Sequence, residues 1–161
     1  MITFKSHSGI HTLKAEQILP ISLEEAWSFF SSPLNLPRIT PSDMSFKVTS
    51  EVDKKAYPGQ IISYKVGILP GVRVNWVTEI TAVKRLSHFI DEQRFGPYTM
   101  WHHEHFFEAL PDGKTLATDK VSYKIPLGPI GNLMNILFIK SKLKHIFSYR
   151  AEKLTELFPN D

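Results

Sequence analysis

The sequence predicts an α+β fold in which one curved antiparallel sheet of about six or seven strands wraps around a long C-terminal helix. Short segments with alternating apolar and polar residues, separated by proline and glycine, fill most of residues 10–125, which is typical of antiparallel strands. From Ile130 to Phe158, apolar residues recur at helical spacing and no proline interrupts them. That segment should form one amphipathic helix of about eight turns. A flat sheet would leave its outer strands uncovered by a single helix, so the sheet should curve around it.

The composition predicts one domain over residues 1–161, long enough to bury most of its apolar surface around one core. The hydrophobic fraction of 42% is that of an ordinary globular protein. No apolar run approaches the roughly 20 residues that span a bilayer, and the N-terminus lacks the apolar segment of a signal peptide. The absence of cysteine excludes disulfides and thiolate chemistry. We therefore expect a soluble, cytoplasmic protein.

The formal net charge is +3, and the sequence pI near 9.1 raises the question of nucleic-acid binding. The basic residues are scattered along the chain, and only Lys140, Lys142 and Lys144 lie close together. Alternate positions on a helix do not share one face, so this group does not form the basic stripe of a nucleic-acid-binding protein. We expect no nucleic-acid partner.

The N-terminal part should hold one strand and two short helices. Residues 1–8 are polar and should be frayed or form a short edge, and the next strand should run over Ile10–Leu19. Ser22 followed by glutamates is typical of a helix N-cap with acids in the first turn, which predicts a helix over Leu23–Phe30. A second helical turn is expected over Leu34–Pro37, and its prolines argue against a longer helix.

Alternation and turn residues predict the remaining strands. These strands are expected over residues 44–52, 60–68, 72–83 and 115–125, with two more in the hairpin Leu86–Leu110, which turns at Gly96-Pro97.

The hairpin Leu86–Leu110 carries the most informative pattern. Period-two alternation places four residues of its second strand on one face: Trp101, His103, His105 and Phe107. Glu104 and Glu108 on the opposite face suit water, so the aromatic face should point inward. On the first strand Phe89 and Asp91 share a face with Phe95. Buried polar groups are costly unless they are paired, so this interior should be either a hydrogen-bonded network or a site.

Five polar residues are predicted to point inward together: Asp91, His103, His105, Asp119 and Arg150. They can be a structural set of paired charges, a receptor for the polar head of an amphipathic ligand, or an acid–base pair for catalysis. Two histidines at i and i+2 with a facing aspartate can also hold a zinc-like ion. No third histidine has a clear place on that face, so we expect neither a metal nor another cofactor.

Large apolar residues should line a pocket beside these polar groups, although core packing explains any single one of them. The candidates are Tyr64, Trp76, Phe89, Trp101, Phe107, Tyr123, Met134, Phe138 and Phe147. Two apolar loops with rigid prolines, 68–72 and 125–130, are either ordinary turns or, with the start of the last helix, a gate or a lip that touches a membrane.

The order of these segments resembles the START-like, or SRPBCC, superfamily with its helix-grip fold. The resemblance is strongest to small bacterial SRPBCC ligand-binding proteins, sometimes labelled cell-division-inhibitor-like, and it covers nearly the whole chain. The segments that carry it are Leu36-Pro37, residues 39–41, 76–80, 89–93, 96–98, Trp101, His103, His105, Phe107, residues 119–123, Pro126, Phe147 and Arg150. The resemblance implies a hydrophobic cavity between the sheet and the last helix. It does not specify a function, because the superfamily contains lipid carriers, receptors and cyclases.

Three functions follow as hypotheses. The first is non-catalytic binding, transport or sensing of a hydrophobic or amphipathic small molecule, lipid-like or aromatic, with transient membrane contact. The second is a polyketide-cyclase/dehydratase-like enzyme that uses His103 or His105 as a base, oriented by Asp91 or Asp119. The third is an interaction protein of cell division or the envelope. No phosphate-binding loop or nucleophile elbow is present, and the aromatic interior favours the first hypothesis. The oligomeric state is not predicted.

Overall fold

The computed structural model describes residues 1–69 and 71–159, except for the side chains of Ile68 and Leu69. Its strands are β1 (Ile2–His7), β2 (Ile10–Leu19), β3 (Lys47–Val48), β4 (Ile61–Leu69), β5 (Val72–Lys84), β6 (His88–Phe95), β7 (Met100–Ala109) and β8 (Thr115–Lys124). Its helices are α1 (Leu23–Phe30), the 3-10 helices η1 (Pro33–Ile39) and η2 (Ser42–Met44), α2 (Gly128–Met134), the π turn η3 (Asn135–Ile139) and α3 (Lys140–Leu157).

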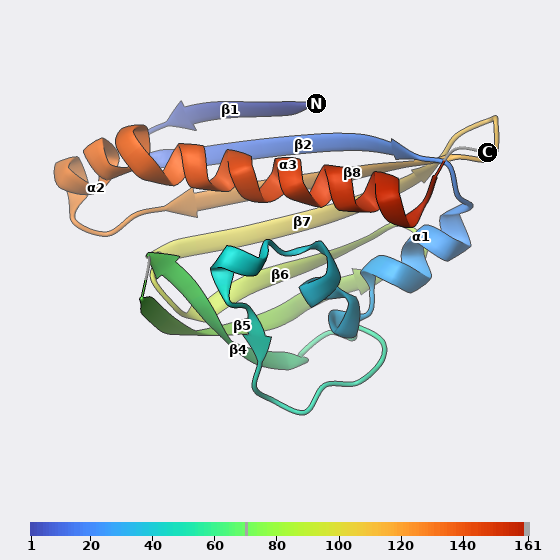
Figure 1. Cartoon of the computed structure of the whole chain (residues 1–161), viewed down its shortest axis with the longest axis horizontal. Coiled ribbons are helices and arrows are strands. Elements are labelled where there is room, and N and C mark those ends of the chain that lie inside the picture. Colours follow the sequence, from blue (N-terminus) through green and yellow to red (C-terminus); the bar gives the residue numbers. More distant parts are fainter. Residues whose placement is uncertain (70, 160–161) are drawn as a thin grey trace.

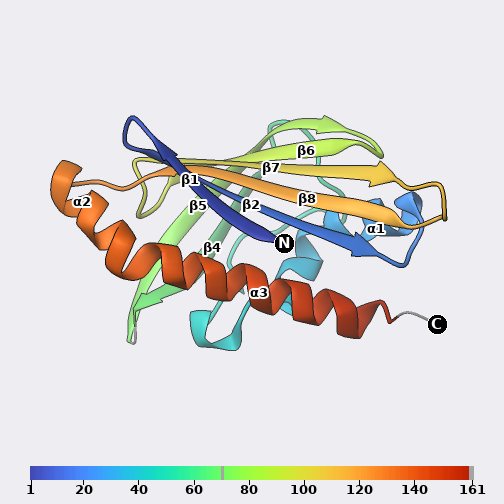
Figure 2. The same cartoon turned by 90° about the horizontal axis from the view of Figure 1, so that it is seen from above.

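The strands form one antiparallel sheet in the order β1-β2-β8-β7-β6-β5-β4-β3. Figures 1 and 2 show this sheet curving around the long C-terminal helix, while α1 and the 3-10 helices cover the same side further along. The sheet has more strands than the six or seven expected, because Ile2–His7 pairs with β2 as an edge strand. Among the described residues, no helix combines the length and apolarity needed to cross a bilayer.

The helix α1 begins and ends where the sequence predicted. Ser22 closes its first turn as a capping box: the Glu25 amide donates to Ser22 Oγ over 3.3 Å, and the Ser22 amide donates to Glu25 Oε2 over 3.1 Å. These two bonds satisfy backbone donors that a helix N-terminus otherwise leaves free.

Three local predictions were wrong. The turn expected over Leu34–Pro37 is a longer 3-10 helix, Pro33–Ile39, because Pro33 lies at its start, where the missing amide proton is not needed. The strand expected over residues 44–52 is reduced to Lys47–Val48, because Met44 ends a 3-10 turn and Ser45 takes a left-handed conformation with φ 43°. Phe95 does not share the inner face with Phe89, since it is 64% exposed. The register of β6 against β5 shifts next to Phe95, and such a bulge turns the following side chain to the other face of the sheet.

The C-terminal helix is continuous in the chain from Gly128 to Leu157, but it is bent at η3 (Figure 2). The buried Tyr123 hydroxyl donates to Asn135 Oδ1 over 2.8 Å at the start of this π turn. Close packing of Gly131 holds α2 against the β8 end of the sheet, because a Cβ at this position would overlap the carbonyl oxygen of Pro126.

We expect Gly131→Ala to destabilise the protein by about 1–3 kcal/mol, the usual cost of overpacking a tight contact. The neighbouring Asn132 is exposed, so Asn132→Ala should change the free energy of unfolding by less than about 0.5 kcal/mol. Urea unfolding of the two variants measures the difference, and equal stability would contradict the close packing of α2.

Candidate binding site

A cavity of about 280 Å³ lies between the concave face of the sheet and α3. Its wall is mostly apolar and is built from α1, the 3-10 helices, four strands, the end of η3 and α3. The apolar lining includes Phe29, Phe30, Leu36, Ile39, Met44, Phe46, Ile62, Tyr64, Val66, Trp76, Ile80, Phe89, Tyr98, Trp101, Ile139, Leu143, Ile146 and Phe147. Its charged and imidazole groups are Asp91, His103, His105, Lys142 and Arg150.

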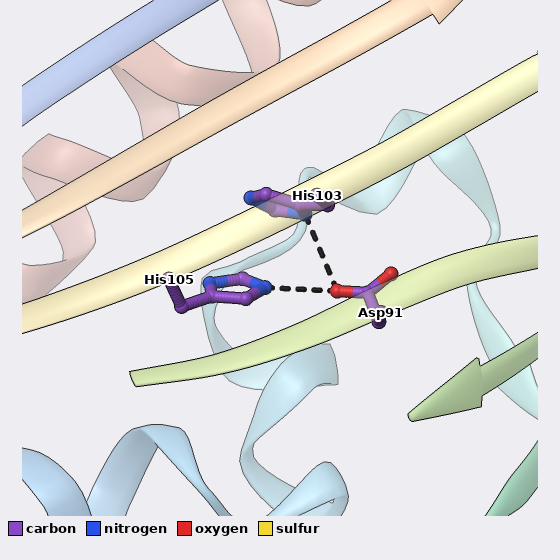
Figure 3. Close-up of side chains that lie close together, drawn as sticks. All are labelled: Asp91, His103 and His105. Atoms are coloured by element: carbon purple, nitrogen blue, oxygen red, sulfur yellow. Dashed lines mark hydrogen bonds and ion pairs between the residues drawn. The ribbon is translucent and has the colours of Figure 1, made fainter. Parts of the chain in front are cut away.

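Asp91 on β6 faces His103 and His105 of β7 (Figure 3). Its Oδ2 lies 2.9 Å from His105 Nε2 and 3.5 Å from His103 Nδ1. The register of the sheet creates this arrangement, because Asp91 is paired directly with His103 and Phe89 is paired directly with His105. The two imidazole rings are tilted by 38° with centroids 3.7 Å apart, and His105 stacks on the Phe89 ring at 4.1 Å.

Asp119 on β8 faces the same two histidines from the other side. Its Oδ1 accepts a hydrogen bond from His103 Nε2 over 3.0 Å, and it lies 2.8 Å from His105 Nδ1 without the alignment of a hydrogen bond. Its Oδ2 accepts a hydrogen bond from Arg150 Nη1 of α3 over 3.1 Å. The two imidazoles therefore lie between two carboxylates, and Arg150 ties the whole set to the helix. We call these five side chains the Asp–His–Arg network.

Burial and mutual contact set the protonation of the network. Burial alone would raise the pKa of Asp119, but Arg150 and the two histidines hold this pKa well below its usual value. Burial also opposes the charge of Asp91, and His103, His105 and Arg150 together keep its pKa below the usual value. Both carboxylates are therefore ionised at neutral pH.

The pKa values of the two histidines shift in opposite directions. Burial and the nearby charge of His105 lower the pKa of His103. Burial acts on His105 in the same direction, but contacts with Asp119 and Asp91 outweigh it and raise the pKa of His105. The distances agree, because both nitrogens of His105 lie within 2.9 Å of a carboxylate oxygen whereas His103 Nδ1 is 3.5 Å away. With Arg150 positive and both aspartates negative, the network is neutral when His105 is protonated and carries one negative charge when it is not.

A second polar group lies on the β4–β5 side of the cavity. Thr78 Oγ1 accepts a hydrogen bond from Trp76 Nε1 over 3.0 Å and shares a further hydrogen bond with the Tyr64 hydroxyl. Burial raises the pKa of Tyr64, so the phenol stays neutral and remains a hydrogen-bonding group. These contacts satisfy the polar atoms of an otherwise aromatic wall.

One buried donor of the network is unused. Arg150 is 8% exposed, and its Nε has no hydrogen-bond partner among the described residues. The guanidinium carbon lies 4.8 Å from the centre of the Phe147 ring, and both residues line the cavity. A buried donor without an acceptor is unfavourable, so a ligand acceptor near Arg150 would be stabilised.

Asp91, His103 and His105 also place potential metal ligands within 4.8 Å of one another. A zinc-like ion could use one carboxylate oxygen and one nitrogen from each ring. Metal binding would require the loss of protons and of the contacts between Asp91 and both rings. Contacts within the Asp–His–Arg network already engage all three side chains without an ion.

The structure brings most of the predicted site residues together. Nine of them line the cavity: Tyr64, Trp76, Phe89, Asp91, Trp101, His103, His105, Phe147 and Arg150. Five others do not appear in its wall: Phe107, Asp119, Tyr123, Met134 and Phe138.

These five occupy three kinds of position. Phe107 packs in the core against Trp27 at 5.9 Å between ring centroids, and Tyr123 is fully buried. Asp119 lies behind the histidines, where it orients them. Met134 and Phe138 point to solvent, with exposures of 41% and 55%. Periodicity could not reveal this exposure, because an apolar helical segment is normally buried. Of the apolar loop 68–72, Pro70 and the side chains of Ile68 and Leu69 lie outside the described residues.

Residues between β2 and β3 supply a part of the wall that sequence reasoning missed. Leu36 and Ile39 of η1, and Met44 of η2, reach the cavity although they lie far from the hairpin in sequence. The one available signal was the cluster of apolar residues and prolines between residues 33 and 44, which is too short to indicate a face.

We expect Asp119→Asn to lower the free energy of unfolding by about 3–5 kcal/mol, because it leaves Arg150 and His105 buried with too little negative charge. The exposed turn residue Asp112 provides the control, and Asp112→Asn should change stability by less than about 0.5 kcal/mol. Denaturant unfolding at pH 7 measures both variants. A loss below 1 kcal/mol for Asp119→Asn would contradict the network as described.

The raised pKa of His105 predicts how stability depends on pH. Folding takes up this proton, so its contribution is complete below the ordinary histidine pKa near 6.5 and is lost as the pH rises through the folded-state pKa. Between these two pKa values the free energy of unfolding should fall by at most about 1.4 kcal/mol per pH unit. His105→Asn should remove this decline, as urea unfolding between pH 6 and 9 would show. A decline of the same size in the variant would assign the proton to another group.

Comparison with known proteins identifies the fold. No protein-family model and no curated protein matches the chain. Protein Ms6760 from Mycobacterium smegmatis is similar with a TM-score of 0.67 and 18% identity, over 98% of this chain and 99% of that one. A START superfamily protein from the same organism has a TM-score of 0.67 and 13% identity, over 91% and 98% of the two chains.

A plant protein shows the same architecture. The major latex-like protein 151 of Panax ginseng has a TM-score of 0.65 and 12% identity, over 95% of this chain and all of that one (100%). The narrower bacterial subfamily named from the sequence stays a prediction. The open antiparallel sheet that curves around a long C-terminal helix is the helix-grip fold of START-like proteins.

Proposed function

We propose that the protein binds a hydrophobic or amphipathic small molecule, lipid-like or aromatic, and acts as a non-catalytic carrier or sensor. The observation that carries this proposal is the cavity of about 280 Å³, which has an apolar wall and a polar group at one side. Small-molecule sites have this composition, in which apolar surface supplies affinity and a few polar groups fix orientation. START-like folds bind hydrophobic small molecules in general, which supports the same conclusion.

The polar side of the cavity favours an amphipathic ligand over a pure hydrocarbon. The unpartnered Arg150 Nε supplies a hydrogen-bond donor, while Asp91 and the histidines are already engaged with one another. Because the two carboxylates leave the Asp–His–Arg network without net positive charge, it suits a neutral acceptor such as a hydroxyl or a carbonyl oxygen. A ligand of this kind dissolves poorly in water, so the proposal includes transient contact with the membrane that would supply it.

Catalysis of the cyclase or dehydratase kind is the second candidate, because His103 and His105 both line the cavity and have shifted pKa values. A general base needs a nitrogen lone pair that can reach a substrate proton. All four imidazole nitrogens instead face Asp91 or Asp119 within 3.5 Å. This arrangement favours a structural and ligand-orienting role for the two histidines.

We expect the neutral probe N-phenyl-1-naphthylamine to bind in the cavity with increased fluorescence. Val66 lines the cavity and is 5% exposed, so Val66→Phe should fill part of the space and weaken probe binding by about tenfold, equivalent to about 1.4 kcal/mol. Val72 is 46% exposed and lies outside the lining, so Val72→Phe serves as the control. Equal probe affinity in wild type and both variants would exclude the cavity as the binding site.

A further inference from the structure

An apolar projection extends from one end of the molecule. It consists of Leu127, α2 and the π turn η3, and Figure 1 shows α2 reaching beyond the ends of the neighbouring strands. Seven large apolar side chains of this segment, each at least 41% exposed, are Leu127, Ile130, Leu133, Met134, Ile136, Leu137 and Phe138. Its buried residues are Gly131 and Asn135, which lie one helical turn apart. The helix therefore contacts the body along a narrow strip and presents apolar side chains on its other faces.

Such a surface is unfavourable in water. Large continuous apolar patches on a folded chain mark contacts with a protein or a membrane. A helix that is apolar on nearly all sides normally lies in a core or in a bilayer. The projection is short and none of the described helices can span a membrane, so its length suits the boundary between headgroups and acyl chains.

The charges around the projection distinguish the two kinds of partner. From Lys120 to Ala151 the sequence contains no aspartate or glutamate. Lys124 precedes the projection, Lys140 and Lys144 follow it, and all three are exposed. A tip of apolar side chains with lysines at its base complements the hydrocarbon and the negative headgroups of an anionic bilayer.

The β4–β5 hairpin reaches the same end of the molecule as α2 (Figure 2). Its Val72 and Arg73 are both exposed, which adds one apolar and one cationic side chain to this end.

We propose that the projection docks the protein on the surface of an anionic bilayer, with its apolar side chains in the headgroup boundary and the flanking lysines near lipid phosphates. A functional consequence rests on the proposed ligand binding. Phe138 is the last exposed residue of the projection, and the next residue, Ile139, lines the cavity. Docking therefore brings a wall of the cavity to the membrane surface, where an amphipathic ligand can enter.

Site-specific labelling tests the docking directly, because the chain has no cysteine. Leu137→Cys, labelled with the polarity-sensitive dye NBD, should brighten and shift to the blue with phosphatidylcholine/phosphatidylglycerol (7:3) vesicles. The response should be much smaller with pure phosphatidylcholine and should weaken with salt. Ile18 is 57% exposed on β2, which ends beside α1, so labelled Ile18→Cys should not respond. Equal responses at the two positions, or none at position 137, would overturn the proposal.

Variants of the unlabelled protein separate the contribution of the apolar side chains to membrane binding from that of the lysines. Leu133→Ser/Leu137→Ser should lower partitioning into the anionic vesicles by at least about tenfold, and the control Ile18→Ser should leave it unchanged. Lys140→Gln/Lys144→Gln should lower it by about fivefold per lysine and reduce its salt dependence. Partitioning that is unaffected by the serine pair would contradict the proposal.

A second copy of the chain is the competing occupant of this surface. In sedimentation without vesicles, the wild-type protein should not self-associate through this surface. Self-association of the wild type that Leu133→Ser/Leu137→Ser abolishes would assign the surface to a dimer and overturn membrane docking. The N-phenyl-1-naphthylamine titration without vesicles keeps this test separate from the ligand proposal. The serine pair should bind the probe as wild type does, so loss of vesicle binding with retained probe binding concerns the projection alone.

Discussion

The rest of the structure depends on two buried carboxylates, those of Asp91 and Asp119. Both contact the imidazoles of His103 and His105, and Asp119 also pairs with the guanidinium of Arg150. Charges can be buried only if each has a partner, and here the partners come from three neighbouring strands and from α3. Asp91, His103 and Asp119 fix the inner face of the sheet, and the bond from Arg150 to Asp119 fixes the helix above it. This requirement sets where the sheet and α3 meet, and the cavity lies beside that contact.

The same network explains why the cavity has two sides of different character. Most of the wall comes from aromatic and aliphatic side chains, whose apolar contacts do not fix the orientation of a ligand. The network adds one polar side whose members mostly satisfy one another, and Arg150 Nε remains as a buried donor. Since the network has no net positive charge, it favours a ligand that offers a hydrogen-bond acceptor without a full negative charge. The apolar projection belongs to a different part of the chain, yet it joins the cavity wall at Ile139.

Strand periodicity predicted the inward positions of Asp91, His103, His105 and Asp119, because alternation fixes which face a side chain occupies. Their mutual distances depend on register, which no single strand reveals. Phe95 was misplaced because a bulge changes that register. Met134 and Phe138 were misplaced for another reason: their apolar helix resembles a core helix in sequence, but the structure leaves it without a covering element. The lining from η1 and η2 depends on tertiary packing, which local patterns do not contain.

The most direct test of the central claim is native mass spectrometry of the freshly purified protein, before and after organic extraction. The account predicts a stoichiometric added mass that extraction removes and that incubation with a total lipid extract restores. The recovered molecule should combine an apolar body with a hydrogen-bond acceptor. A protein that carries no extractable mass and gains none from the lipid extract would contradict the claim that the cavity beside the Asp–His–Arg network is a ligand site.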